Sequence, residues 1–435
     1  MGVSLRRRSF AAAALVAVAA LAGMSACSQK PEQTTPGQPI TLNVDVFGQF
    51  GYEDLYKQYE AANPGIKIVE RGTGARLDDH TTRMTQQLAA GSGMGDIVAI
   101  EEGTLIQFKA QSDKFVNLLD QGASADQGNF LPWKWEQGLS ADGKSLMGLG
   151  TDVGGMGICY RTDLYKAAGL PTDREAVSAL FPTWEAFITK GEEFKTKTPN
   201  VAWADAGTNF YNVILMQKAG ASSGYTYYDK SNNFVMSSNP AIKESFDLTM
   251  SLVSKGLTAK LFTFSDEWAA GTKQSKFANV PCPAWMTGVI EGNAGPEQKG
   301  KWDIAKAPGG GNWGGSFLSV PKQSTHQAEA AKLARFLTSP QGQIAAWKSK
   351  GNLPSSPQAQ ADPSVADKKN EYFSNAPTGT IFAAGAKDLK PVYMGPKNQA
   401  VRTEVENAIR AVEQGQLKAD AAWAKALADA EKASK

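Results

Sequence analysis

Apolar and polar positions alternate where the folded part of the chain begins, and the spacing then becomes helical. Residues 40–46 alternate as a strand, residues 53–62 have the spacing of an amphipathic helix, and residues 66–69 predict a second strand. Asn63-Pro64-Gly65 ends the helix. Strand, helix and strand in this order predict a βαβ unit, the building block of an α/β fold.

The loop after the first strand is the first candidate ligand contact. Sheets built from βαβ units bind ligands beyond the carboxyl ends of their strands. This loop carries Phe47, Gln49 and Phe50, which are therefore candidate contacts. The alternative is that the two phenylalanines only cover the start of the following helix.

A further strand, predicted over residues 96–100, ends on the adjacent carboxylates Glu101 and Glu102. Two carboxylates divide acid and base work in many hydrolases. Neighbouring residues on a strand point to opposite faces, so these two cannot easily flank one bond. We therefore favour a carboxylate that accepts hydrogen bonds from two hydroxyl groups of a sugar.

Two later stretches carry polar candidates. Residues 144–160 form a long apolar run with repeated glycine and with Asp152, which suits a segment whose dihedral angles absorb a rotation between domains. Residues 205–212 place Asn209 and Tyr211 before an apolar helix. These two residues are either ligand contacts or plain capping groups.

A strand predicted over residues 276–283 is followed by Trp285, where the next helix begins. An indole ring is a platform for the apolar C–H face of a pyranose, whose hydroxyls then meet hydrogen-bonding groups at the rim. Trp285 is therefore an aromatic candidate. Trp268, which has small and apolar neighbours, is expected in the core.

The segment from Gly310 to Pro357 has the most ordered pattern. It opens on a glycine-rich stretch with Trp313 and Gly314 and continues as an apolar strand, a helix capped by Ser324 or Thr325, and a second helix. The order of strand, Val-Pro-Lys, capped helix with a Phe-Leu pair, Ser-Pro, Gln-rich helix and Gly-x-x-Pro strongly resembles the C-terminal half of the extracellular solute-binding proteins of sugar ABC importers.

Other motifs extend the resemblance over nearly the whole chain from Ile40 to Lys432. The closing helices, expected over residues 400–414 and 418–432, look like those of maltose-binding-type proteins. The remaining motifs are Gly95-Asp96-Ile97-Val98, Tyr160-Arg161-Thr162-Asp163-Leu164, Gly169-Leu170-Pro171, and Thr183-Trp184-Glu185 with Thr183 as a helix N-cap.

This resemblance implies an α/β, periplasmic-binding-protein-like fold of two α/β domains with a hinge and a ligand cleft between them. Residues 40–150 and 316–355 would form the first domain, and residues 151–315 and 356–435 the second. The implied protein is not an enzyme, needs no cofactor, and captures an oligosaccharide of two or three units for the permease subunits of an ABC transporter. The expected ligand contacts are Phe47, Gln49, Phe50, Glu101, Glu102, Asp152, Asn209, Tyr211, Trp285, Trp313, Gly314 and Asn398. The resemblance makes Trp285 the leading aromatic candidate, because relatives carry a stacking aromatic after this strand, and it supports Asp152, where relatives often use a polar residue on the sugar. At the position of Asn398 relatives often carry an aromatic residue, which this sequence lacks.

The N-terminus has the parts of an export signal. Arg6–Arg8 is basic, Ala11–Ala22 is apolar but too short for a stable membrane anchor, and Met24–Ala26 precede Cys27 as a cleavage site. The cysteine resembles a bacterial lipobox, which implies a signal peptide over residues 1–26, lipidation of Cys27 and a lipid anchor at the outer face of the cell membrane. Ordinary signal cleavage is the alternative. The polar, proline-rich residues 27–39 predict a flexible linker.

Net charge, cysteines and histidines bear on three properties: nucleic-acid binding, disulfide formation and metal binding. The formal net charge is +2, and without Arg6–Arg8 it is about −1, so nothing indicates nucleic-acid binding. Cys159 and Cys282 lie in apolar runs, and an oxidising compartment predicts a disulfide between them, with two isolated thiols as the alternative. Neither of the two histidines neighbours a cysteine or carboxylate at ligand spacing, which argues against a metal site.

Two other functions remain open from the residues. A protein of the same fold binds a polyol or a phosphorylated glycerol, but a phosphate favours Arg or Lys in the cleft loops, where Lys397 is the exception among Phe, Trp, Asn and acidic residues. A secreted glycoside hydrolase needs two carboxylates about 5–10 Å apart, for which Glu101, Glu102 and Asp152 are the candidates.

Overall fold

The computed structural model describes residues 39–387, 389 and 391–435. The predicted signal peptide, Cys27 and all of the predicted linker except Pro39 lie outside the described residues. The described residues belong to one compact unit, which contains two β-sheets.

The first sheet has five strands in the order β2-β1-β3-β9-β4. β1 is parallel to β2 and β3, whereas β9 is antiparallel to β3 and β4. The parallel β1–β2 pair and the helix between these strands form the predicted βαβ unit. The strands are β1 Ile40–Asp45, β2 Ile66–Arg71, β3 Ile97–Glu101, β4 Leu149–Gly150 and β9 Ser316–Ser319.

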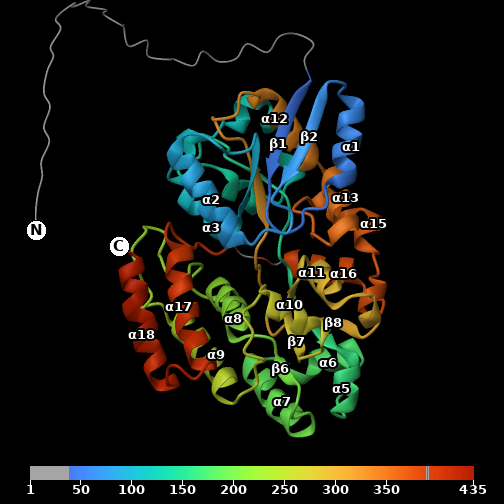
Figure 1. Ribbon diagram of the computed structural model, residues 1–435, viewed down its shortest axis with the longest axis vertical. Helices are drawn as coiled ribbons and strands as arrows, with labels where there is room; N and C mark the ends of the chain where they lie inside the picture. The colour runs from blue at the N-terminus through green and yellow to red at the C-terminus, as the bar shows by residue number, and fades with distance from the viewer. Residues whose placement is uncertain (1–38, 388, 390) are drawn as a thin grey trace, which may run out of the picture. The chain divides into compact units, whose positions relative to one another are not determined.

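Helices bury apolar faces against this first sheet. α1 buries Leu55, Tyr56 and Tyr59, whose spacing places them on one side of the helix, and Figure 1 shows α1 beside β2. Short 3-10 turns lie between α3 and α4. The helices are α1 Glu53–Ala62, α2 Leu77–Ala90, α3 Glu102–Lys109, α4 Pro132–Gly138, α12 Gln327–Leu337 and α13 Pro340–Lys350, and the 3-10 turns are Ser112–Lys114, Leu118–Gln121 and Ala123–Asn129.

The second sheet has four strands in the order β6-β7-β5-β8. β5 is antiparallel to β7 and β8, and β6 is parallel to β7. A buried disulfide between Cys159 and Cys282 joins β5 to β7, with 5.3 Å between their Cα atoms. The strands are β5 Met156–Arg161, β6 Ala202–Ala204, β7 Phe277–Pro283 and β8 Trp302–Lys306.

α8 and α9, which lie between β6 and β7 along the chain, pack with the C-terminal helices α17 and α18 in a helical layer. The apolar faces of these helices share one core cluster, and Figure 1 shows α17 beside α18. The helices are α5 Thr162–Ala167, α6 Arg174–Leu180, α7 Trp184–Lys197, α8 Gly207–Ala221, α9 Pro240–Ser254, α10 Asp266–Lys273, α11 Met286–Ala294, α14 Pro357–Ala361, α15 Pro363–Ala366, α16 Thr378–Lys387, α17 Asn398–Glu413 and α18 Ala419–Ala433, with 3-10 turns at Pro296–Gln298 and Glu371–Phe373.

The two predicted helix caps have different outcomes. Thr183 caps α7 as predicted, because its hydroxyl accepts a hydrogen bond from the Ala186 amide at 3.2 Å. The prediction for α12 is wrong, since the residue that precedes it is His326, which makes no side-chain cap. Ser324 is engaged elsewhere: it accepts from the His326 amide and donates to the Asp96 carboxylate at 2.6 Å.

We call three connecting segments the crossing segments. Residues 151–155 join β4 of the first sheet to β5 of the second, residues 307–315 join β8 of the second sheet to β9 of the first, and residues 351–356 join α13 to α14. They are joined to one another or to the adjoining strand by backbone hydrogen bonds of 2.9 Å, from Thr151 to Ser316, from Val153 to Leu353 and from Trp313 to Gly154. The predicted domain boundaries fall at these segments and stay a prediction.

Candidate ligand-binding site

Three aromatic residues, which we call the aromatic group, gather where a crossing segment meets the start of α11: Phe264, Trp285 and Trp313. The Trp285 and Trp313 rings lie 5.5 Å apart between centroids at 60°, and Phe264 lies 6.0 Å from Trp285. The Trp285 indole nitrogen donates to the Trp313 carbonyl at 3.0 Å. Both tryptophans are half-buried, and 42% of Phe264 is exposed. The group therefore offers apolar faces to a ligand.

A tight turn fixes the position of this group. Gly314 and Gly315 have φ of +82° and +109°, which side chains rarely adopt. A Cβ on Gly314 would also lie only 3.1 Å from the Trp285 indole nitrogen. The predicted contact Gly314 thus lies against the leading aromatic candidate, and glycine is needed there for close approach.

Glu101 and Glu102 bind different partners, but not because they alternate along one strand: Glu101 is the last residue of β3, and Glu102 is the first residue of α3. Glu101 caps α3 by accepting from the Gly103 amide at 2.7 Å. Burial of this carboxyl raises the pKa of Glu101 to about 7, although the guanidinium of Arg402 lowers it in part. Glu101 as a whole residue is half-buried.

Glu102 is enclosed by polar partners instead. Its carboxylate accepts from Asn312 at 2.7 Å and from Gln137 at 3.1 Å, and it lies 3.7 Å from the Lys134 ammonium. Burial raises the pKa of Glu102, and Lys134 is the largest influence in the opposite direction. Both carboxylate oxygens of Glu102, a predicted sugar contact, therefore accept hydrogen bonds from protein side chains.

Asp152 is also buried and occupied. Its Oδ1 accepts from the Ser316 amide at 2.9 Å and from the Thr151 hydroxyl at 2.6 Å. Burial raises the pKa of Asp152, and the charge of Lys134 opposes that rise. Asp152 therefore cross-links two strand ends beside the crossing segments.

Asn398 is the first residue of α17 and touches α3. Its side-chain amide donates to the Gly103 carbonyl at 3.3 Å. The next residue, Gln399, donates to Asp78 of α2 at 2.9 Å. The N-terminus of α17 thus lies against the part of the molecule that contains the first sheet, close to Glu101.

The first predicted loop lies beside a crossing segment. Asn352 donates to the carbonyl oxygens of Gln49 and Phe50 at 3.2 and 3.1 Å. The Gln49 side chain is exposed and Phe47 is half-buried, whereas Phe50 is buried. Phe47 packs 5.4 Å from His80 of α2 and 5.5 Å from Phe50, measured between ring centroids, and its contact with a ligand stays a prediction.

Asn209 and Tyr211 are buried in α8, and within the described residues neither makes a hydrogen bond or ring contact directly to the aromatic group; Asn209 is linked to it only through Asp205 and Trp268, whose ring lies 5.6 Å from that of Phe264. Asn209 donates to Asp205 at 2.6 Å, and the Tyr211 and Tyr227 hydroxyls are 2.9 Å apart. Burial raises the pKa of Asp205 to about 7. Trp268 is fully buried, as predicted, and donates to Asp205 at 2.8 Å.

Several residues around the site carried no usable sequence signal. Lys134 is a fully buried lysine between two tryptophans, and Asn312 is a polar residue in a glycine-rich loop. Arg76, in the loop before α2, donates to the Phe264 carbonyl at 3.2 Å, and its guanidinium lies 4.8 Å from the Phe262 ring. Only partners distant in sequence give these side chains their roles.

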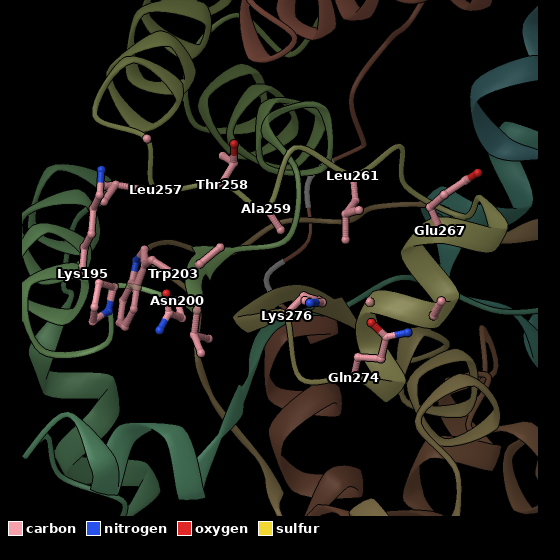
Figure 2. Close-up of a pocket in the computed structure, with 16 residues that line it drawn as sticks. Lys195, Asn200, Trp203, Leu257, Thr258, Ala259, Leu261, Glu267, Gln274 and Lys276 are labelled. Atoms are coloured by element: carbon pink, nitrogen blue, oxygen red, sulfur yellow. The ribbon is translucent and has the colours of Figure 1, made fainter.

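An open hollow of about 550 Å³ lies elsewhere, between α7, β6 and α10. Figure 2 shows Lys195, Trp203 and Leu257 on one side of it and Glu267 and Gln274 on the other. None of the predicted ligand contacts lines this hollow. Within the described residues, no cluster of three or more His, Cys, Asp or Glu side chains suits a metal ion, and no helix has the length and apolar character to cross a membrane.

Comparison with protein families gives a match to the model for bacterial extracellular solute-binding proteins over residues 54–373. A solved structure of an extracellular solute-binding protein of family 1 is 41% identical, with a TM-score of 0.79, and the alignment covers 91% of this chain and 100% of the other. A comparison with curated proteins found no match.

More distant structures share the fold. A binding protein associated with an ABC transporter of B. animalis subsp. lactis Bl-04, in complex with β-1,6-galactobiose, is 19% identical, with a TM-score of 0.76 and coverage of 91% of this chain and 99% of the other. The galacto-N-biose/lacto-N-biose I-binding protein of Bifidobacterium longum is 16% identical, with a TM-score of 0.74 and coverage of 92% and 98%.

These matches confirm the resemblance and the periplasmic-binding-protein-like fold that it implies. The family and fold are those of solute-binding proteins, which are not enzymes. The chain belongs to the bacterial extracellular solute-binding proteins and is similar to their family 1 members.

Proposed function

We propose that this chain is the membrane-anchored binding protein of a carbohydrate ABC importer. It captures an oligosaccharide of two or three units between two domains, residues 40–150 with 316–355 and residues 151–315 with 356–435. The closed complex then delivers the sugar to the permease. The chain itself carries out no chemical reaction on the sugar and uses no cofactor.

The observation that carries this proposal is the half-exposed Trp285–Trp313 pair, with exposed Phe264 beside it. A pyranose has an apolar C–H face that packs on an indole ring and a rim of hydroxyls that needs polar partners. A flat aromatic surface on a fixed turn suits such a ligand better than it suits an ion or a phosphate.

We place the polar partners of the hydroxyls on groups around the crossing segments and the start of α3. Glu101 uses Oε2 on the Gly103 amide, and its Oε1 accepts no hydrogen bond from the described residues. Gln49 supplies an exposed amide, and Asn398 lies at the start of α17. We assign as ligand contacts Phe47, Gln49, Glu101, Trp285, Trp313, Gly314 and Asn398. Glu102 and Asp152 do not contact the ligand in this assignment but hold the neighbouring segments in place.

The ligands of the distant relatives support the class of solute. Those proteins bind β-1,6-galactobiose, lacto-N-biose and, in Listeria monocytogenes, cycloalternan, although each is under 20% identical to this chain. These three ligands are oligosaccharides, whereas a solute-binding protein of Thermotoga lettingae, 17% identical to this chain, is bound with the single sugar α-D-tagatose. The family favours an extracytoplasmic location, and lipidation of Cys27 would hold the protein at the membrane beside its permease.

Domain closure follows from contacts that a ligand makes better in one arrangement than in another. In this structure Arg76 reaches the Phe264 carbonyl, and Gln399 reaches Asp78. The first contact joins the α2 region to the segment before α10, and the second joins it to α17. A sugar lying on the aromatic group stabilises this arrangement.

The test is a thermal-shift screen of the folded chain against gluco-, xylo-, manno-, malto-, galacto- and chito-oligosaccharides. A ligand that binds only the folded state at 100 times its Kd stabilises it by about 2.7 kcal/mol. Trp285→Ala should abolish the shift. Trp423→Ala is the matched control, because Trp423 is also half-buried but packs on Phe246 in the helical layer.

A shift from one sugar series that survives in Trp423→Ala and is lost in Trp285→Ala supports the proposal. A shift that survives in Trp285→Ala, or the absence of any shift across the screen, contradicts it. Separately, Cys27→Ser should release the protein from the membrane fraction; release of the wild-type protein to the same extent contradicts the anchor.

A further inference from the structure

Asn312 ties three segments together with one side chain. Its Oδ1 accepts from the Gly154 amide at 2.6 Å, and its Nδ2 donates to Glu102 at 2.7 Å and to the Gly314 carbonyl at 3.1 Å. Asn312 is 5% exposed, so water does not replace these partners. Two crossing segments and the first turn of α3 therefore meet at a single buried amide.

The same amide fixes the turn that carries the aromatic group. Gly314, whose carbonyl it holds, follows Trp313, and the Trp313 carbonyl in turn accepts from the Trp285 indole. The Trp313 amide donates to the Gly154 carbonyl at 2.9 Å, so both sides of the turn are held. The position of each tryptophan ring therefore depends on the contacts of Asn312.

Glu102 is held in place for this contact by a buried cation. Lys134 is fully buried, its ammonium lies 3.7 Å from Glu102 Oε2 and 4.1 Å from the Phe317 ring centre, and it has no hydrogen-bond partner within the described residues. A Cβ on Gly315 would lie 2.9 Å from this ammonium. Glycine at the turn therefore leaves the space in which Lys134 approaches Glu102.

We propose that Asn312 is a positioning residue for ligand binding, anchored by Glu102 and Lys134, and that it sets the mutual geometry of Trp285 and Trp313. The positioning role of Asn312 rests on the proposed function only in the effect that it predicts for sugar affinity. The geometry of the tryptophan pair is a property of the unliganded protein and is measured without any sugar.

The test uses two single variants and their combination. Asn312→Asp removes the donor to Glu102 and places two carboxylates together. Glu102→Gln keeps the shape but removes the charge that Lys134 and Asn312 face. The double variant Asn312→Asp/Glu102→Gln restores one hydrogen bond with donor and acceptor exchanged, and it keeps the net charge of the wild type.

Asn279→Asp is the matched control. Asn279 is a fully buried asparagine in β7 that accepts from the Tyr165 hydroxyl at 2.7 Å and donates to the Trp203 carbonyl at 2.9 Å. The substitution introduces the same buried carboxylate away from the aromatic group. It therefore reports a general loss of stability without a change in the tryptophan pair.

The first readout is the exciton band of the two coupled indoles in circular dichroism, identified as the signal lost in Trp285→Phe. We expect Asn312→Asp to lose this band, the double variant to recover part of it, and Asn279→Asp to keep it. The second readout is the Kd for the sugar found in the screen, which should rise about 10-fold to 100-fold in Asn312→Asp.

An unchanged band in folded Asn312→Asp overturns the proposal, whatever happens to affinity. An equal loss of the band in Asn279→Asp also overturns it, because the loss would then reflect stability alone. If no sugar binds the wild-type protein while the band behaves as expected, the proposed function fails and the positioning role stands.

Discussion

Removing the disulfide between β5 and β7 should cost the protein much of its stability without changing its fold. Cys159 and Cys282 are fully buried in neighbouring antiparallel strands, where backbone hydrogen bonds hold both positions independently of the sulfur atoms. Cys159→Ala/Cys282→Ala is the direct perturbation. Because both side chains are small, the cavity left behind is limited.

The size of the effect follows from the length of chain that the bond closes. The two cysteines are 123 residues apart. In the chain-entropy description, a loop of that length removes about 16 cal/mol/K from the unfolded chain, or about 5 kcal/mol at 25 °C. We expect the double variant to lose about 3–5 kcal/mol, since relaxation of the native strands offsets part of the entropic term.

Urea unfolding at equilibrium measures this loss. The midpoint should fall and the m-value should rise, because an unfolded chain without the cross-link exposes more surface. The wild-type protein treated with a reductant should unfold at the same midpoint as the double variant. A loss under about 1 kcal/mol, or a reduced wild type that unfolds like the oxidised one, refutes the reasoning.

Three further predictions concern pH dependence, ligand affinity and a close backbone contact. Burial raises the pKa of Asp205 to about 7 from an ordinary value of 3.8, so between these values the folded state holds a proton that the unfolded state has lost. Its contribution therefore makes the free energy of unfolding fall as pH rises from about 4 to about 7. Asp205→Asn should flatten the pH dependence of the free energy of unfolding measured in urea, and an unchanged slope contradicts this. Arg76→Ala removes the donor to Phe264 and the cation beside Phe262, so sugar affinity measured by calorimetry should weaken by about 0.5–2 kcal/mol, while exposed Lys57→Ala should leave it unchanged. Gly154→Ala would place a Cβ 1.9 Å from the Trp313 carbonyl oxygen and should destabilise by about 1–3 kcal/mol in thermal unfolding, whereas Gly292→Ala, with open space around it, should be neutral or stabilising.

Elements with complete local signals could be predicted from the sequence almost to the residue. α1 covers Glu53–Ala62 as expected, because the apolar spacing and the Asn63-Pro64-Gly65 stop are both local. The last helix, Ala419–Ala433, lies within one residue of its predicted bounds. Cap positions were harder: Ser324 has the right chemistry for α12, but Asp96, far away in sequence, takes its hydroxyl.

The predicted site residues fall into the same two groups: those with a local sequence signal and those placed by long-range packing. Local patterns mark Trp285, at a strand–helix junction, and Gly314, in a glycine-rich turn. The two residues are in contact in the structure. Asn209 and Tyr211 are buried because α8 lies between other helices, and only long-range packing determines that. Lys134 looks like a surface lysine in its own segment, and its burial depends on Glu102 and Gly315, which are distant in sequence.

The polar character of the crossing region has a physical reason. Burying Glu102, Asp152 and Lys134 costs desolvation energy that their mutual attraction only partly offsets, so an apolar cluster of the same size would be at least as stable. An apolar cluster, however, accepts many arrangements of similar energy, whereas the hydrogen bonds of Asn312, Glu102 and Asp152 require their partners at set distances and directions. The network around Asn312 holds the turn to which the aromatic group is attached, and this is why we expect its loss to change the geometry of the tryptophan pair more than overall stability.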